Sequence, residues 1–157
     1  MTDDPLYSRS LLRLAADAAG AGRLPQHDAA GAAHNPACGD HVGVELALTQ
    51  GRITALAHQT QACILTQASA ALLAQTAMGC DRDALAQLAE SVQAMLTQAG
   101  PAPVGYEVFA GAADHGGRHV CVLLPLRAAL KALEQFQESR EAVLRQELRP
   151  SDKVSPA

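Results

Sequence analysis

Three cysteines and one aspartate are the residues best suited to chemistry in this chain. Cys38 and Asp40 lie two residues apart, and Cys63 and Cys121 follow further along. Thiolates and carboxylates bind zinc and iron, and a thiolate is also a nucleophile. These four residues are therefore candidates for a metal site or for sulfur chemistry. The fourth cysteine, Cys80, is predicted to be a small buried hydrophobe.

A predicted hairpin brings two of these cysteines together. Gln50-Gly51 can form a two-residue turn between two antiparallel strands. With that turn, Cys38 would lie opposite Cys63, and Asp40 opposite Gln61. Directly opposed Cβ atoms are about 5 Å apart, close enough for two thiolates to share one metal ion. The hairpin alone therefore predicts three ligands of a tetrahedral site.

The other predicted features of the site lie at Cys63 and around Cys121. Cys63 is expected to begin a helix, where the macrodipole favours a thiolate over a thiol. Only the tertiary fold can bring Cys121 back as a fourth ligand. Arg118 is a candidate counter-charge for a site rich in anions, the alternative being a solvated surface arginine. His119 would project to the same side as Cys121 on an extended segment, as an alternative ligand, a proton carrier or simply an exposed polar residue.

The order of strand and helix patterns along the sequence predicts an α+β fold, with a small antiparallel sheet packed against several helices. These elements must position the candidate residues. The sheet is expected to contain a hairpin at about residues 42–58. Residues 1–149 are predicted to form a single domain, and 150–157 a disordered tail. Helices are expected at 6–19, at 64–78 and at about 123–148, and a further helix is expected to begin after an N-cap at Asp81. Loops are expected at 26–37 and 105–117.

Composition excludes several classes of partner. The chain has 157 residues with 12 Lys+Arg against 16 Asp+Glu, a net charge of -4, which provides no basic field for nucleic acid or an anionic membrane. The weakly charged stretch 53–80 contains too many Gln, Thr and Ser residues for a spanning helix and is interpreted as core. The first residues resemble neither a secretory signal nor a transit peptide, so a cytoplasmic, reducing location is expected.

Several short motifs together resemble the U-type iron-sulfur cluster scaffolds, the family of IscU, SufU and NifU N-terminal domains. The resemblance covers about residues 6–135. The motifs are Asn35-Pro36-Ala37-Cys38-Gly39-Asp40, Gly51-Arg52-Ile53, Ala62-Cys63-Ile64 with Ala68-Ser69-Ala70, and Arg118-His119-Val120-Cys121.

The resemblance implies a site and a set of partners. Cys38, Asp40, Cys63 and Cys121 would hold Zn²⁺ or a transient [2Fe-2S] cluster, with Cys121 as the candidate sulfur acceptor. A SufS-like cysteine desulfurase would supply the sulfur, and iron-sulfur apoproteins would receive the product. The protein is expected to have no independent turnover, its only enzymatic role being persulfide transfer with the desulfurase.

The resemblance is greatest to the SufU branch. Arg118 stands three residues ahead of Cys121, in place of a histidine immediately before it, and the IscU segment Leu-Pro-Pro-Val-Lys is absent. That branch implies a zinc-containing sulfur acceptor as well as a scaffold, and the sequence leaves both roles open. One departure is the family's glycine-rich approach to the second cysteine, which here reads His58-Gln59-Thr60-Gln61-Ala62.

Two other interpretations remain at this stage. A structural zinc ion could hold the hairpin to the helices while the surface binds another protein. Alternatively, the chain could be a degenerate homologue without a metal site. The sequence sets no oligomeric state.

Overall fold

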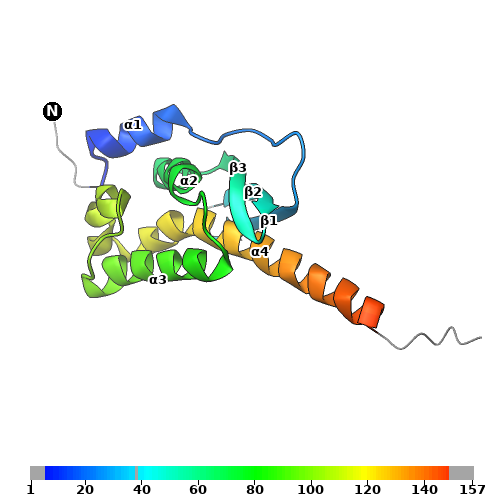
Figure 1. Ribbon diagram of the computed structural model, residues 1–157. Helices are drawn as coiled ribbons and strands as arrows, with labels where there is room; N and C mark the ends of the chain where they lie inside the picture. Colours follow the sequence, from blue (N-terminus) through cyan, green and yellow to red (C-terminus); the bar gives the residue numbers. More distant parts are fainter. Residues whose placement is uncertain (1–5, 38, 149–157) are drawn as a thin grey trace, which may run out of the picture.

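The computed structural model describes residues 6–37 and 39–148, and it confirms the predicted α+β fold (Figure 1). The sheet lies against α4, while α2 packs beside β3 and α1, and α3 runs along α4. The elements are α1 (Arg9–Asp17), β1 (Ala29–Asn35), β2 (Asp40–Thr49), β3 (Arg52–Gln61), α2 (Ile64–Thr76), α3 (Arg82–Gln98), the 3-10 helices η1 (Tyr106–Asp114) and η2 (Gly116–Arg118), and α4 (His119–Leu148). The predicted tail at 150–157 lies outside the described residues.

The three strands form an antiparallel sheet in the order β1-β2-β3. Gln50 and Gly51 join β2 to β3 with φ values of 53° and 76°, which confirms the predicted two-residue turn. A bulge beyond Ala47 shifts the register, so that His41, and not Asp40, lies opposite Gln61. The predicted pairing was therefore wrong by one residue at the end of the hairpin that carries the site.

The predicted loop at 26–37 is wrong, because most of it forms strand β1. This strand reads Ala-Ala-Gly-Ala-Ala-His-Asn and lacks the large β-branched residues that mark most strands. Its small residues allow close approach to α4. A Cβ on Gly31 would stand 2.5 Å from the Ala128 carbonyl oxygen and 2.6 Å from the Ala132 nitrogen.

The helices agree with the sequence except near the end of the core. Asp81 caps α3 as predicted, accepting a 2.8 Å hydrogen bond from the Ala84 nitrogen. The expected loop at 105–117 is instead two 3-10 helices, in which the buried Tyr106 and Phe109 stack at the three-residue spacing of that helix. Helix α4 begins at His119, four residues before the predicted start.

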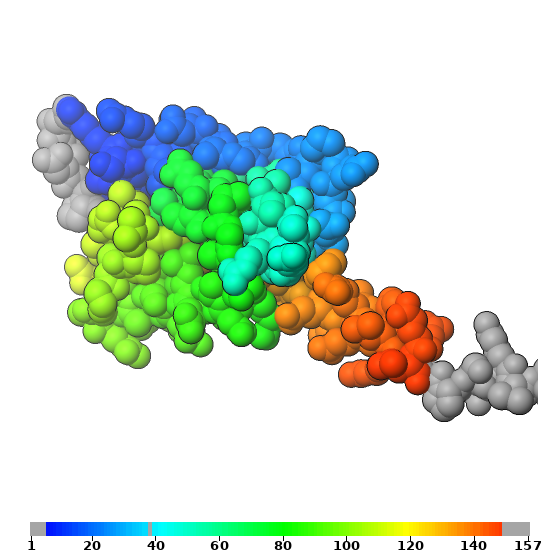
Figure 2. Space-filling model, viewed as in Figure 1, coloured from blue at the N-terminus to red at the C-terminus, as the bar shows by residue number. Residues whose placement is uncertain are grey.

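Helix α4 is buried along its first half and exposed along its last turns. Its first half is buried under the sheet and α2, whereas its last turns extend beyond the body of the protein (Figures 1 and 2). Within the described residues, no helix combines the length and apolar character that crossing a bilayer requires. The stretch 53–80 provides β3 and α2, and much of it is buried in the core.

Candidate metal centre

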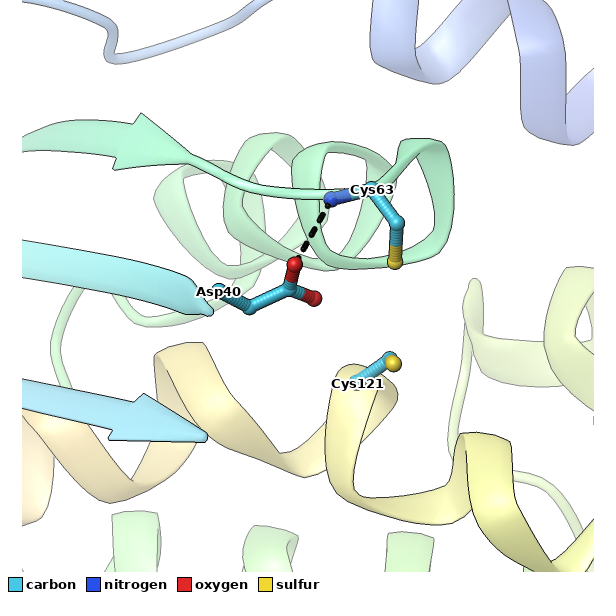
Figure 3. Close-up of side chains that lie close together, drawn as sticks. All are labelled: Asp40, Cys63 and Cys121. Atoms are coloured by element: carbon cyan, nitrogen blue, oxygen red, sulfur yellow. Dashed lines mark hydrogen bonds between the residues drawn. The ribbon is translucent and has the colours of Figure 1, made fainter. Parts of the chain in front are cut away.

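Three elements bring a carboxylate and two thiols to one point. Asp40 begins β2, Cys63 is the N-cap of α2, and Cys121 lies in the first turn of α4 (Figure 3). One ligand atom of each residue lies within 4.8 Å of those of the other two. The fold thus brings together three of the four ligands that the sequence predicted. Cys38 falls outside the described residues.

Asp40 is held in place by the start of α2. Its side chain is buried, with the residue only 5% exposed. One carboxylate oxygen accepts a 3.2 Å hydrogen bond from the Cys63 backbone N–H, and the other accepts a 3.0 Å bond from the Thr66 hydroxyl. Each carboxylate oxygen has two lone pairs and can accept more than one bond.

Thr66 links the carboxylate to a thiol and was missed at the sequence level. Its buried hydroxyl oxygen lies 3.4 Å from the Cys63 sulfur as well as 3.0 Å from Asp40. Because its single proton goes to Asp40, the thiol of Cys63 is the donor in the other contact. The signal that could have found it is position, since Thr66 stands three residues after the N-cap and shares the site's side of the first turn.

Both thiols lie at helix N-termini. Cys63 precedes the first residue of α2, and Cys121 is the third residue of α4. The unpaired N–H groups and macrodipoles there place partial positive charge beside both sulfurs, which suits sulfur bound to a metal. Ser69 fixes the two helices relative to each other, because its buried hydroxyl donates a 2.5 Å hydrogen bond to the Val122 carbonyl.

Arg118 provides positive charge beside the site. The pKa of its guanidinium is raised, first by Tyr7 and then by a hydrogen bond with the Cys121 side chain. The nearby Cys63 and Cys121 sulfurs add to the effect. Arg118 therefore lies beside the Cys121 sulfur while remaining accessible to solvent, and its role as counter-charge stays a prediction.

The three residues are chemically and geometrically suited to a metal ion. Thiolates with a carboxylate form a donor set that fits zinc or iron-sulfur iron. In a tetrahedral site with Zn–S bonds of about 2.3 Å, neighbouring ligand atoms lie about 3.8 Å apart. The observed separations, all within 4.8 Å, need only a small contraction.

The sequence also made predictions for His119 and for the fourth cysteine, Cys80. The extended segment expected at His119 is wrong, because this residue begins α4 and its ring nitrogen lies 3.0 Å from the Ala113 carbonyl oxygen. Cys80 sits beyond the far end of α2, half-buried against the core, and its sulfur contacts the Thr76 carbonyl. Burial is the main cause that raises the pKa of Cys80, with Asp81 second.

The unusual approach to Cys63 has a structural role. His58 is buried, with one ring nitrogen 2.8 Å from the Ala19 carbonyl oxygen and the other 2.9 Å from the Thr60 hydroxyl. Its backbone pairs with Gly20 and Gly22. His58 therefore ties β3 to the segment after α1 at the start of the approach to Cys63.

Comparisons with known proteins place these features in context. Residues 6–116 match the model of the NifU-like N terminal domain, a match that ends before Arg118 and Cys121. No curated protein matches the chain.

Solved structures are similar over most of the chain. The N-terminal NifU-like nitrogen-fixing protein of Brucella abortus is 32% identical with a TM-score of 0.80, covering 86% of this chain and 96% of its own. A SUF-system iron-sulfur cluster assembly scaffold from Fervidobacterium islandicum AW-1 is 18% identical with a TM-score of 0.75, covering 84% and 99%. A hypothetical protein is 22% identical with a TM-score of 0.70, covering 79% and 96%.

Proposed function

Since the chain belongs to the NifU-like N-terminal domain family, we propose that it acts in cytoplasmic iron-sulfur cluster assembly. Its cargo is sulfur together with Zn²⁺ or the iron of a nascent [2Fe-2S] cluster. Cys38, Asp40, Cys63 and Cys121 hold that cargo. The observation that carries the proposal is the convergence of Asp40, Cys63 and Cys121 from three elements, with ligand atoms within 4.8 Å of one another.

The mixed donor set suits temporary binding. A bound metal centre would supply a Lewis acid that keeps the cysteine sulfurs deprotonated. Carboxylate oxygen is a poorer match to iron-sulfur iron than thiolate, so the Asp40 ligand dissociates more readily. The Cys63 N–H and the Thr66 hydroxyl are ready to receive the freed carboxylate, because they already hold it in the fold described above.

We infer a SufU-type role within the family from the region around Cys121. Its support is Arg118, which stands three residues before Cys121 and hydrogen-bonds to its sulfur. In that role, the Cys121 thiolate attacks the outer sulfur of a persulfide on a SufS-like desulfurase. A new S–S bond forms at Cys121 while the desulfurase thiolate leaves, so the step needs no external oxidant.

Access distinguishes the two cysteines as sulfur acceptors. Cys121 is only 2% exposed, whereas Cys63 is partly exposed. Transfer to Cys121 therefore requires local opening at the η2–α4 junction, where Arg118 lies. Mass spectrometry of the chain after reaction with ³⁵S-cysteine and desulfurase would locate the persulfide. Label on Cys121 supports the assignment, and label confined to Cys63 contradicts it.

The proposed function is tested by metal analysis and an ultraviolet-visible spectrum on protein purified without oxygen. Both are repeated after adding desulfurase, cysteine and ferrous iron. Persistent zinc with enhanced desulfurase turnover supports sulfur acceptance, and a visible iron-sulfur chromophore supports the scaffold role. The absence of metal and chromophore in both conditions contradicts the proposal and leaves the degenerate homologue.

Asp40→Ala separates this function from a purely structural zinc ion. If the ion is structural, the variant loses or weakens its zinc and melts earlier than wild type. If the site is functional, the variant keeps metal on its thiolates but loses sulfur or cluster exchange. Metal content and exchange are measured on the same preparation, so the two outcomes are distinguished directly.

A further inference from the structure

Strand β1 lies at the edge of the sheet, where one side of its backbone faces no neighbouring strand. The strand order is β1-β2-β3, and β1 pairs with β2 from Ala29 to Asn35. Among the residues that the structure describes, no backbone hydrogen bond outside this pairing involves residues 29–34. The outward N–H and C=O groups of β1 are therefore open to pairing with another chain.

The features that usually protect an edge strand are missing from β1. Proteins commonly block such an edge with a charged side chain, a proline or a bulge. Strand β1 reads Ala-Ala-Gly-Ala-Ala-His-Asn, and its register with β2 is continuous. Ala30 and Ala32, on the face turned away from the core, are exposed and too small to keep another strand at a distance. The edge is thus regular and sterically open.

A groove lies beside this edge, where the end of β1 meets the outward side of α4. Ala33 and His34 line it from the strand, and Leu124 and Leu130 give it an apolar lining from the helix. Of the sheet, β1 alone contributes to the lining, which places the groove on the open side of the strand. A second hollow, beside residues 29–30, continues along β1. We call the first hollow the β1 groove.

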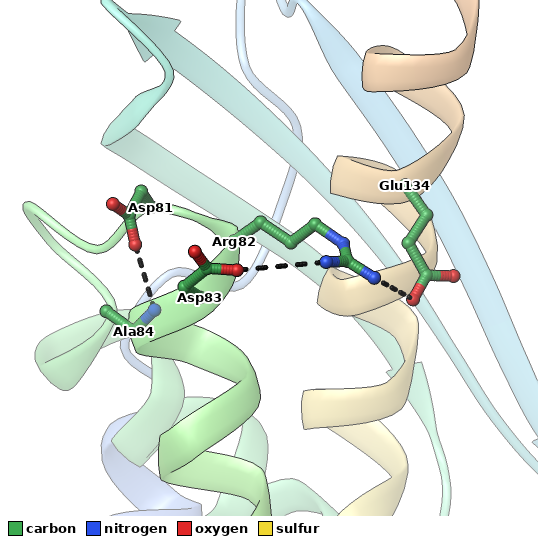
Figure 4. A network of polar contacts seen from close by, with 5 residues as sticks. All are labelled: Asp81, Arg82, Asp83, Ala84 and Glu134. Carbon is green, nitrogen blue, oxygen red and sulfur yellow. Dashed lines mark hydrogen bonds and ion pairs between the residues drawn. The ribbon is translucent and has the colours of Figure 1, made fainter.

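The β1 groove carries positive charge in a chain whose net charge is -4. Arg127 and Lys131 line it, and both are exposed. Neither forms an ion pair within residues 6–37 and 39–148. Its one acidic residue, Glu134, is already paired with Arg82 at 3.6 Å (Figure 4). Two uncompensated cations therefore remain, and they favour an anionic occupant.

The spacing of the two cations suits an extended chain. Arg127 and Lys131 are one helical turn apart, a rise of about 6 Å along α4. Alternate side chains on one face of a strand are about 6.6–6.8 Å apart. Two acidic residues separated by one residue can therefore reach both cations. An apolar side chain two residues before or after them can reach Leu124 or Leu130.

We propose that β1 binds an extended acidic segment of a partner protein as a fourth strand of the sheet, with its carboxylates on Arg127 and Lys131. The segment's backbone pairs with the open edge of β1, and its side chains enter the β1 groove. A nucleic acid offers negative charge but lacks the alternating N–H and C=O groups that this edge requires. A second copy of the chain is disfavoured, because twofold pairing of two β1 edges brings the cations of both copies to one seam.

The β1 groove adjoins the candidate metal centre. Asn35, which directly follows the groove residue His34, is paired with Asp40. Leu124 lies one turn after Cys121 on α4. A bound segment therefore brings its protein to the side of the centre, as exchange of cargo requires. The binding of a strand is independent of cargo, whereas its use in exchange rests on the proposed function.

The first test is fluorescence anisotropy of the full chain with a labelled peptide, Val-Thr-Glu-Thr-Glu-Thr-Val, at low salt with a chelator present. We expect a Kd of about 10–100 µM that weakens as salt is added. The lysine peptide Val-Thr-Lys-Thr-Lys-Thr-Val should bind at least about tenfold more weakly, because its charges repel Arg127 and Lys131. The absence of saturable binding up to about 1 mM overturns the proposal and leaves the two cations as charges that protect the edge from aggregation.

Charge reversal tests the assignment to Arg127 and Lys131. The double variant Arg127→Glu/Lys131→Glu should bind the lysine peptide more tightly than the glutamate peptide. The matched control is Arg145→Glu, an exposed position about 21 Å further along α4, which should keep the wild-type preference. A double variant with the wild-type preference, or self-association of the chain that the peptide reverses, contradicts an acidic partner strand. Circular dichroism verifies that the variants keep the wild-type melting curve.

The second test separates strand pairing from a purely ionic contact. Two versions of the glutamate peptide are N-methylated at alternate residues, so that each lacks the N–H donors of one edge. Because only one edge faces β1, one version should lose at least about tenfold in affinity and the other should bind like the parent. Amide hydrogen exchange in residues 29–35 should slow when the parent peptide is bound. Equal affinities of both versions, or unchanged exchange in β1, refute the added strand. Neither measurement uses metal or sulfur, so failure here is distinguishable from failure of the proposed function.

Discussion

The hydroxyl of Thr66 is predicted to stabilise the site before any metal binds. Thr66→Val keeps the shape of the side chain but removes its hydrogen bond to the Asp40 carboxylate and its contact with the Cys63 sulfur. Thr66 is fully buried, and Asp40 is 5% exposed. Water therefore cannot replace the lost donor without local opening of the start of α2.

The size of the effect follows from the type of bond. A hydrogen bond to a charged group contributes about 1.5–3 kcal/mol to the free energy of unfolding. A buried acceptor that loses a donor also remains desolvated without compensation, which destabilises the fold. We expect Thr66→Val to lower the free energy of unfolding by about 2 kcal/mol. For a chain of this length, that corresponds to a melting temperature about 4–8 °C lower.

The assay is urea unfolding of the reduced protein with a chelator present, so that metal binding does not contribute. Thr66→Ser retains the hydroxyl and should recover most of the loss. Thr97→Val is the matched control, because the Thr97 hydroxyl donates to the Gln93 carbonyl on an exposed helix surface. A loss below about 0.5 kcal/mol for Thr66→Val, or an equal loss for Thr66→Ser, refutes the reasoning.

Three further predictions concern the frame of the site. Gly31→Ala should destabilise by about 2 kcal/mol in thermal unfolding, because its Cβ meets the α4 backbone. Gly43→Ala should be neutral, because its Cβ meets only the Gln59 carbonyl oxygen at an ordinary contact distance of 4.0 Å, and equal losses would contradict this. Burial lowers the pKa of His58 below 6.5, so the unfolded chain binds a proton that the folded chain does not, and stability should fall as pH decreases through about 6.5. His58→Gln should flatten that slope in urea unfolding at several pH values, and an unchanged slope would assign it to other groups. Arg118→Ala should weaken zinc binding about tenfold in chelator competition through loss of counter-charge, an effect that Arg127→Ala, on the exposed side of α4, should not reproduce.

Much of the fold could be predicted where local chemistry decides the structure. The Gln50-Gly51 turn and the Asp81 cap depend on a few neighbouring residues, and both were found from sequence. Strand β1 could not be found, because its alanines and Gly31 are selected for contact with α4 rather than for strand propensity. Its partner helix lies almost 100 residues further along the chain.

The site, too, could be predicted only where local sequence decides the structure. Cys63 at the start of a helix follows from the change in apolar period, and the structure places it there. The register beside Asp40 depends on a bulge near the other end of the hairpin, which the alternating pattern does not reveal. Thr66 gains its role only when β2 and α2 meet. The sequence shows its position three residues after the Cys63 N-cap but does not reveal the carboxylate to which it donates.

The most direct test of the central claim is an anaerobic cobalt titration of the reduced protein, followed by its thiolate-to-metal charge-transfer band. We predict saturation near one equivalent of Co²⁺, an unchanged band in Cys80→Ser, and a weakened band in both Cys63→Ser and Cys121→Ser. A wild-type protein without the band, or one whose band survives both site substitutions, would contradict a metal centre at these residues.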